Sequence, residues 1–233
     1  MLANNETGVV QPIKEISHGL KSLESGLIFH SDAVQAVATT KIDFHNLGVQ
    51  SAALSGHKIG GPKGIGFMFL SSEVKVPSFF HGGKQELERR AGTVNVSGVA
   101  SLSAALDEQQ KNITKQNQNI LKERTDFEEM IKHSLDVMVV GDSVKRLEHI
   151  SNIQFKNIHS ETLMVALDLQ GLGVSRGSAC ASGAQRPSHV LQAMKVSNDK
   201  INSHLRFSFG WNTQVGDGIK AAKIVLSSIE GMK

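Results

Sequence analysis

The sequence predicts an α/β fold in two parts, on the strength of three observations. Short apolar runs alternate with helical segments and glycine-rich turns through the first hundred residues, an order typical of a layered sheet. The segment from about 96 to 133 has few helix breakers, so we expect one long helix that bridges two lobes. Strand-like and helix-like segments alternate again after it. We therefore divide the chain into residues 1–100 and residues 101–233.

The first part is expected to begin with a helix and to continue with three strands. Pro12 suits the first turn of a helix, and apolar residues follow it at helical spacing. Gly26 is expected to close this helix. We expect a short buried strand at 27–29 and two further strands at 51–54 and 65–70.

The second part continues the alternation after the long helix. Glycines at 141 and 171 separate its segments, and we find no internal repeat or low-complexity tract. The expected elements are a strand at 152–155, a helix at 160–170, a loop at 175–188, a strand at 205–209 and a final helix at about 215–229.

Composition and charge exclude several classes of protein. The net charge of +3 is spread along the chain without a run of Lys and Arg, which argues against nucleic-acid and membrane partners. No apolar run is long enough to cross a bilayer, and the first residues lack the pattern of a signal peptide. A single cysteine excludes an internal disulfide. We therefore expect a cytoplasmic protein, or one of an equivalent reducing compartment.

The stretch SGHKIGGPKG, residues 55–64, places Lys58 between an expected strand and a glycine-rich turn. A lysine there can form a Schiff base with an aldehyde cofactor, because glycines let a large flat ligand approach closely. Asp32 and Gln35 follow the preceding strand, so we expect them at the same crevice as Lys58. Asp32 can keep a pyridine nitrogen protonated, and Gln35 can hydrogen-bond a ring hydroxyl. Taken alone, each favours a plainer role: Asp32 as a cap of the next turn, and Lys58 as a surface lysine.

Cys180, the only cysteine, lies among small and polar residues in SRGSACASG, residues 175–183. Such residues cannot build a core around the thiol, and Arg176 is close to it in the sequence. This setting favours an exposed, reactive thiolate. The alternative is a buried structural cysteine, which the polar context disfavours.

Three further residues are candidates for binding. Arg206 alternates with leucine and phenylalanine in LRFSFG, so its side chain is expected on the face opposite the aromatics. A guanidinium there suits bidentate capture of a carboxylate, and a solvated strand face is the equal alternative. Thr93 lies in RRAGT, a small loop that suits a phosphate, and His57 can stack, transfer protons or merely pack. The dispersed histidines and one cysteine predict no metal site.

Six blocks of this sequence resemble the cysteine desulfurases, pyridoxal-phosphate enzymes of the class-V aminotransferase group. They occur in the family's order and span essentially the whole chain: ANNETGVVQPI, HSDAVQ, SGHKIGGPKGIG, RRAGT, SRGSACASG and LRFSFG. The resemblance implies part of a fold-type I pyridoxal-phosphate-dependent transferase. Residues 1–100 would be the C-terminal portion of its large, mostly parallel cofactor-binding domain, and residues 101–233 a smaller α+β domain with the cysteine loop.

The resemblance also implies how the cofactor is held. Lys58 would bind it covalently and then move the α-proton of the substrate. Asp32 would pair with the pyridine nitrogen, Gln35 with the ring oxygen, and Thr93 would reach the cofactor phosphate of a partner subunit. The full set of cofactor-binding residues would be Asn5, Asp32, Gln35, Ser55, His57, Lys58 and Thr93, with Ser55 and His57 at the phosphate.

The implied reaction removes sulfur from L-cysteine. Asn5 and Arg206 would bind the substrate, with Arg206 on its carboxylate. Cys180 would attack the substrate sulfur and leave L-alanine and a persulfide on Cys180. The implied partners are a second copy of the chain, in a homodimer, and an iron–sulfur scaffold or another sulfur-acceptor protein.

The chain departs from the family at both ends. Members carry a region before the asparagine loop that supplies part of the sheet, a phosphate-binding turn and a histidine that stacks on the cofactor, and we expect an N-terminally truncated member. The longer C-terminal tail that docks a scaffold protein in some members is also missing. Two alternatives therefore stand: a catalytically incompetent fragment or partner of a full-length subunit, and another class-V enzyme such as a selenocysteine lyase or an aminotransferase.

Overall fold

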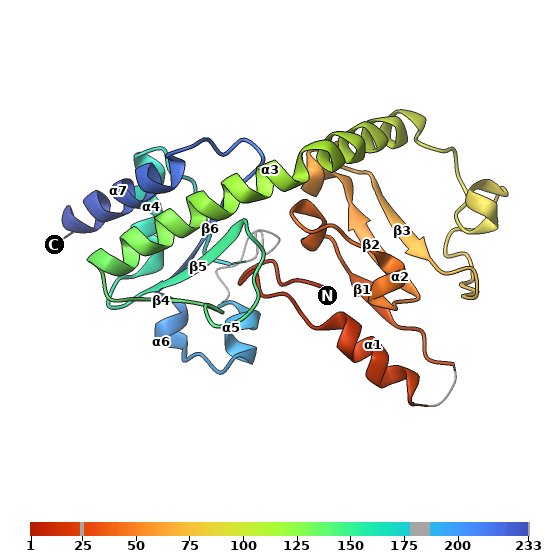
Figure 1. The fold of residues 1–233 in the computed structure, drawn as a ribbon, viewed down its shortest axis with the longest axis horizontal. Coiled ribbons are helices and arrows are strands. Elements are labelled where there is room, and N and C mark those ends of the chain that lie inside the picture. Colours follow the sequence, from red (N-terminus) through yellow and green to blue (C-terminus); the bar gives the residue numbers. More distant parts are fainter. Residues whose placement is uncertain (24–25, 178–186, 233) are drawn as a thin grey trace. The chain divides into compact units, whose positions relative to one another are not determined.

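The computed structural model describes residues 1–23, 26–177 and 187–232. Three short 3-10 helices accompany the main elements: η1 (Ala36–Ala38), η2 (Gly56–Ile59) and η3 (Gln85–Glu88). The helices and strands in chain order are α1 (Ile13–Lys21), β1 (His30–Asp32), α2 (Phe44–Leu47), β2 (Ser51–Ser55), β3 (Gly66–Leu70), α3 (Val96–Ser134), β4 (Val137–Val139), β5 (Ile150–Phe155), α4 (Ser160–Leu169), α5 (His189–Ala193), α6 (Asn198–Ile201), β6 (His204–Ser208) and α7 (Asp217–Glu230) (Figure 1).

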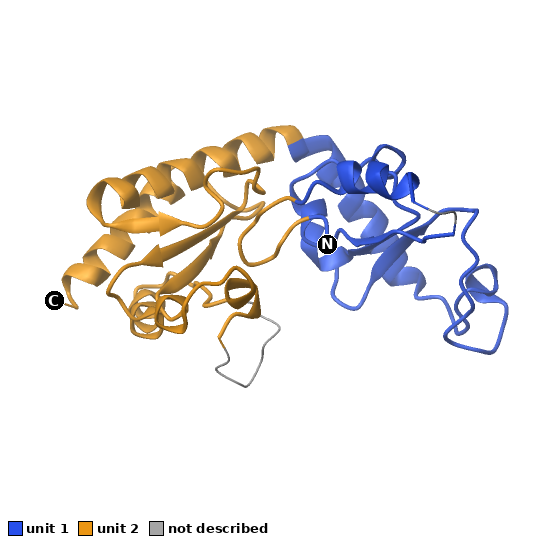
Figure 2. Ribbon diagram, turned by 90° about the horizontal axis from the view of Figure 1, so that it is seen from below, with its two compact units in different colours: residues 1–2, 11–113 blue, residues 3–10, 114–233 orange. Residues whose placement is uncertain are grey.

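The chain divides into two compact units (Figure 2). The first unit holds residues 1–2 and 11–113, and the second holds residues 3–10 and 114–233. Helix α3 starts in the first unit and ends in the second, as a long helix that bridges two lobes would. Whether these units act as a cofactor-binding domain and a cysteine-loop domain stays a prediction.

The first unit contains a three-stranded sheet in the order β1-β2-β3. Strands β1 and β2 are parallel, whereas β2 and β3 are antiparallel. Gly66 pairs with Ser55, and a Cβ atom at Gly66 would lie 2.5 Å from the Leu54 carbonyl oxygen, so the close pairing requires glycine there. The strands expected at 51–54 and 65–70 are confirmed.

Two expectations for the first unit are wrong. The helix α1 ends at Lys21 and not at Gly26, because the Ser22 hydroxyl and amide both bond to the Gly19 carbonyl, which ends the helix early. The strand expected at 27–29 lies three residues later, as β1. Pairing with β2 begins at His30, so residues 27 and 28 are left outside the ladder with exposed side chains.

The second unit contains an antiparallel sheet in the order β4-β5-β6. Helices α3, α4 and α7 cover one of its faces (Figure 1), and the expected strands and helices of this part are confirmed apart from small shifts of their ends. The short elements β4, α5 and α6 were not expected. The core on the helix-covered face consists of Phe127, Ile131, Val139, Ile153, Phe155, Leu163, Leu167, Leu205, Phe207, Ala222, Val225 and Ile229.

The opposite face of β5 and β6 is polar but largely buried. Asn152 lies across from Arg206 and Gln154 across from His204 in the ladder. Alternation along a strand sends these four side chains away from the apolar core. Asn152, Gln154 and His204 are nevertheless buried, so this face is covered by other parts of the second unit.

Neither a membrane-spanning helix nor a cluster of metal ligands occurs among the described residues. No helix among them has the length and apolar character that a membrane crossing needs. Within the same residues, no three His, Cys, Asp or Glu side chains gather closely enough to hold a metal ion.

Candidate functional site

The first unit brings Asp32 and Lys58 to one edge of its sheet. Asp32 is the last residue of β1, and Lys58 lies in η2 directly after β2. Because β1 and β2 are adjacent and parallel, their carboxyl ends meet at the same edge. Both side chains are exposed, and in the described part of the chain no hydrogen bond or ion pair engages the Lys58 ammonium group. This edge presents a carboxylate and a lysine together.

The Asp32 carboxylate also caps the turn that follows β1, which is the alternative role considered for it from the sequence. Its Oδ1 atom accepts a hydrogen bond of 2.8 Å from the Val34 backbone amide. A carboxylate has about four acceptor positions, so one such bond leaves capacity for a second partner. Gln35 follows at the residue before η1 and is half-buried.

Ser55 and His57 are joined at the start of η2. The Ser55 hydroxyl lies 2.7 Å from His57 Nδ1, and Ser55 is the last residue of β2. The turn after them is tight, because a Cβ atom at Gly61 would lie 2.9 Å from the Gly56 carbonyl oxygen. The hydroxyl, the imidazole and a glycine-rich backbone therefore form one polar strip beside Lys58.

Thr93 is exposed in the segment between η3 and α3. No hydrogen bond among the described residues joins it to Asp32, Ser55 or Lys58.

The second unit brings Asn5 and Arg206 into contact. The Arg206 Nη1 atom donates a hydrogen bond of 2.8 Å to the Asn5 carbonyl oxygen. Beside it, Asn152 Nδ2 donates to the Glu6 carbonyl oxygen at 3.2 Å. Two successive peptide carbonyls of the N-terminal turn are thus held by side chains on the polar face of β5 and β6. The two predicted substrate-binding residues are neighbours.

Local hydrogen bonds and close packing fix the conformation of the turn formed by residues 3–10. Asn4 Oδ1 accepts hydrogen bonds from the backbone amides of Glu6 and Thr7, both at 2.9 Å. Gly8 has a φ of +76°, and a Cβ atom there would lie 3.1 Å from Ile150 Cβ, so the turn approaches β5 as closely as only glycine permits. The position of the Asn5 backbone follows from these contacts.

The chain that leads to the cysteine runs along β6. Ser175 and Arg206 exchange two backbone hydrogen bonds, of 2.6 and 3.1 Å. Arg176 then pairs with Glu161 at 3.2 Å. Cys180 itself lies outside the described residues.

His204 is a buried neighbour of Arg206 on the same face of β6. Its Nδ1 atom lies 2.9 Å from Asn152 Oδ1. Burial lowers the pKa of His204 from 6.5 to about 4, so the ring is neutral at pH 7. Its Nε2 atom is buried and has no hydrogen-bond partner among the described residues.

Sequence reasoning missed four buried polar residues of the second unit. Glu6 had a signal, since it stands between the two asparagines and Thr7 in the block ANNETG. The other three had none, because their partners are far away in the sequence. These residues are Glu6, Asn152, Ser188 and His204.

The donor set of the first unit fits pyridoxal phosphate. Asp32 supplies a carboxylate for a ring nitrogen, and Lys58 an unengaged amine for an aldehyde. The Ser55 hydroxyl and His57 imidazole supply hydrogen-bond donors for a phosphate. These residues would hold the cofactor.

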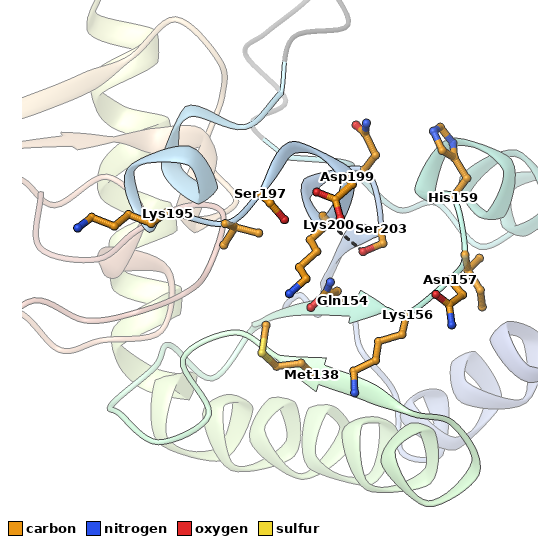
Figure 3. A pocket seen from close by; sticks show the side chains of 13 residues that line it. Met138, Gln154, Lys156, Asn157, His159, Lys195, Ser197, Asp199, Lys200 and Ser203 are labelled. Atoms are coloured by element: carbon orange, nitrogen blue, oxygen red, sulfur yellow. Dashed lines mark hydrogen bonds between the residues drawn. The ribbon is translucent and has the colours of Figure 1, made fainter.

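A separate cavity lies in the second unit, with a volume of about 970 Å³ (Figure 3). Residues of β4, of the end of β5 and of the segment around α6 line it, and Lys200 extends toward Gln154. Lys156, at its rim, pairs with Asp136 at 2.7 Å. None of the predicted site residues lines this cavity.

Comparison with known proteins identifies the family of this chain. The family Aminotransferase class-V matches residues 1–218. The chain belongs to this family. Its enzymes depend on pyridoxal phosphate, and its members include the cysteine desulfurases.

Several known proteins resemble most or all of this chain. It is 37% identical over 233 residues to the cysteine desulfurase IscS of Methanosarcina thermophila, covering 100% of this chain and 57% of that protein. The structure of a NifS-like protein from Rickettsia africae ESF-5 superposes with a TM-score of 0.86 at 31% identity, over 99% of this chain and 59% of the other. A structure of SspA in complex with cysteine gives a TM-score of 0.70 at 28% identity, over 89% and 57%.

The fold is therefore that of part of a NifS-like, fold-type I enzyme. The chain spans less than two thirds of the length of these relatives.

Proposed function

We propose that this chain carries the chemistry of a cysteine desulfurase, which removes sulfur from L-cysteine and leaves L-alanine and a persulfide on Cys180. The observation that carries the proposal is the placement of Asp32 and Lys58 at one edge of the parallel strand pair. The relatives named cysteine desulfurase support the choice of reaction within the family.

Each residue of the first unit has a distinct task in this proposal. When bound, the cofactor withdraws electrons from the α-carbon of the substrate through its protonated pyridine ring. Asp32 holds the proton on that ring nitrogen, and Gln35 orients the ring oxygen. Ser55 and His57 bind the phosphate. Lys58 takes the α-proton of the substrate and returns it, as a base that stands free in the described structure.

The second unit binds the substrate and accepts the sulfur. Arg206 binds the carboxylate of L-cysteine, and the Asn5 carbonyl holds the guanidinium in place through its 2.8 Å hydrogen bond. The Cys180 thiolate attacks the substrate sulfur, so that a new S–S bond forms while the Cβ–S bond of the substrate breaks. The electron pair of that bond stays with the carbon, which takes a proton to give L-alanine.

We further propose the assembly in which this reaction runs. Residues 1–100 act as part of the cofactor-binding domain, and residues 101–233 as the domain that carries the cysteine loop. The protein works in the cytoplasm as a homodimer, in which Thr93 reaches the cofactor phosphate of the partner subunit. Thr93 is exposed and forms no hydrogen bond with Lys58 among the described residues, which supports this placement. The persulfide then passes to a sulfur-acceptor protein such as an iron–sulfur scaffold.

A covalent-labelling experiment tests the cofactor site. The protein is mixed with pyridoxal phosphate, reduced with borohydride and digested, and the modified lysine is located by mass spectrometry. We expect the label on Lys58, and its loss in Lys58→Ala. Lys63→Ala is the matched control, because Lys63 is an exposed lysine of the same glycine-rich stretch and should leave labelling unchanged. Equal labelling of both lysines, or none, would overturn the proposal and favour a non-catalytic chain.

The sulfur step has its own test. Cys180→Ala should retain the cofactor label on Lys58 and the spectral response to L-cysteine, but should form no persulfide and release no sulfide. Loss of the label in this variant would count against the role of Cys180 as a sulfur acceptor alone.

A further inference from the structure

A buried carboxylate without a role in the reaction lies at the centre of the second unit. Glu6 is only 1% exposed. Burying a carboxylate is costly unless hydrogen bonds compensate it. Among the described residues its side chain has one hydrogen-bond partner, the Ser188 hydroxyl, at 2.5 Å. A carboxylate buried at this cost in free energy is expected to stabilise a particular arrangement of the segments around it.

The proton arrangement at Ser188 is defined by its two contacts. The hydroxyl hydrogen points to Glu6 Oε2, and the hydroxyl oxygen accepts the Leu191 backbone amide at 3.1 Å. Ser188 is thereby the N-cap of helix α5. Glu6 fixes the start of α5 through this one hydroxyl.

Glu6 also lies beside Gly177, which precedes Cys180 in the sequence. A Cβ atom placed on Gly177 would lie 3.4 Å from Glu6 Oε2, so the backbone of Gly177 passes directly beside the carboxylate. Gly177 is the last described residue before residues 178–186, and Ser188 is the second described residue after them. One carboxylate therefore bonds to one flank of the segment that contains Cys180 and lies beside the other flank.

The backbone of Glu6 is tied to the residues proposed to bind the substrate. Its carbonyl accepts from Asn152, and the preceding carbonyl, that of Asn5, accepts from Arg206. Glu6 thus links Arg206, the residue proposed to bind the carboxylate, with both flanks of the cysteine segment, and all of these residues belong to the second unit.

We propose that Glu6 is a positioning residue that sets where the Cys180 thiol can reach relative to Arg206. The inference rests on the proposed function, in which Cys180 accepts sulfur from a substrate held by Arg206. The proposal gives Glu6 no contact with substrate or cofactor. It acts through Ser188 and Gly177.

The chain offers a readout that needs no activity. Cys180 is the only cysteine and Trp211 the only tryptophan, and both belong to the second unit. A fluorescent acceptor attached to Cys180 therefore reports, by time-resolved energy transfer from Trp211, the distribution of distances between these two residues. We expect this distribution to broaden in Glu6→Ala and in Ser188→Ala, and to stay as in the wild type in Ser188→Thr, which keeps the hydroxyl. The double variant Glu6→Ala/Ser188→Ala should broaden it no more than either single change, because both remove the same link.

A kinetic readout separates positioning from a general loss of structure. In a single turnover with L-cysteine, persulfide formation on Cys180 should slow by about 10- to 100-fold in Glu6→Ala, the usual effect of misplacing a reacting group. Cofactor labelling of Lys58 should be unchanged. Glu6→Gln, which keeps the size and an acceptor oxygen, covers the case in which Glu6→Ala fails to fold, and should show a smaller slowing and broadening.

The outcomes are distinguishable. An unchanged distance distribution in folded Glu6→Ala or Glu6→Gln would overturn the positioning role whatever the activity. Broadening in a chain whose wild type forms no persulfide would support the role of Glu6 at the ends of this segment and overturn the proposed reaction alone.

Discussion

Substituting Gly218 with alanine should destabilise the second unit. Gly218 lies in the first turn of α7, where the helix meets α3. Its amide donates a hydrogen bond of 2.9 Å to Glu123 Oε2, and the Gly216 amide donates to the same atom at 3.0 Å. The buried carboxylate of Glu123 thus caps the start of α7, and the two backbones lie in direct contact.

The geometry sets the size of the effect. A Cβ atom at Gly218 would lie 2.0 Å from the Glu123 carbonyl oxygen, whereas ordinary contact begins at 3.4 Å, so the helices would have to separate by about 3.4 − 2.0 = 1.4 Å. Overpacking of this kind costs about 1–3 kcal/mol. The better helix propensity of alanine offsets up to about 1 kcal/mol. We expect a net loss of about 2 kcal/mol, which corresponds to a fall in melting temperature of about 4–8 °C.

Thermal unfolding followed by circular dichroism measures this loss, and hydrogen exchange locates it in α7. Gly231→Ala is the matched control, since Gly231 follows the other end of the same helix and a Cβ atom there meets nothing closer than 3.6 Å. It should change the melting temperature by no more than about 1–2 °C. Equal melting temperatures for Gly218→Ala and Gly231→Ala would refute the close contact of α7 with α3.

Two further predictions concern buried charge and titration in the second unit. His204 has a pKa of about 4 when folded and 6.5 when unfolded, so the unfolded state binds more protons between these values. The free energy of unfolding should therefore fall by about 2–3 kcal/mol as the pH drops from 6.5 to 4. Urea titrations at several pH values should show that His204→Gln loses this dependence of stability on pH. The same dependence in the variant and the wild type would contradict the role of His204. Glu128→Ala should cost about 3–5 kcal/mol in the same assay, because Arg146, whose side chain is 6% exposed, loses two 2.9 Å hydrogen bonds and keeps a weaker 3.4 Å contact with Asp142. The control is Asp126→Ala, which removes only a surface ion pair on the same helix and should cost about 0.3–0.5 kcal/mol. Equal costs for Glu128→Ala and Asp126→Ala would show that the Glu128 ion pair contributes no more than a surface ion pair.

The sequence predicts best where local propensity and packing agree. The long helix α3 was predictable because favourable residues accumulate over many turns. The first strand was misplaced because the apolar side chains at 27 and 28 are exposed, while the pairing that defines β1 depends on β2, some twenty residues away. Apolar composition reports burial only on average, and register is decided by the partner strand.

In the candidate site, too, the sequence predicts residues set by local patterns better than residues set by distant contacts. Asp32 and Lys58 could be found from local patterns, since Asp32 ends β1 and Lys58 lies in the turn that follows β2. Glu6 could not be assigned a contact, because its partners Asn152 and Ser188 are 146 and 182 residues away in the sequence. No periodicity relates such residues, so only the folded chain shows that they meet.

The N-terminal turn has a consequence for how this protein is made. Residues 3–10 leave the ribosome well before strand β6, yet both belong to the second unit. The hydrogen bond from Arg206 to Asn5 closes a separation of 201 residues. Contacts so distant along the chain form late, because the loop between them must close first. The second unit can therefore reach its final form only after β6 has been synthesised, and until then residues 3–10 lack their partners on the polar face of β5 and β6.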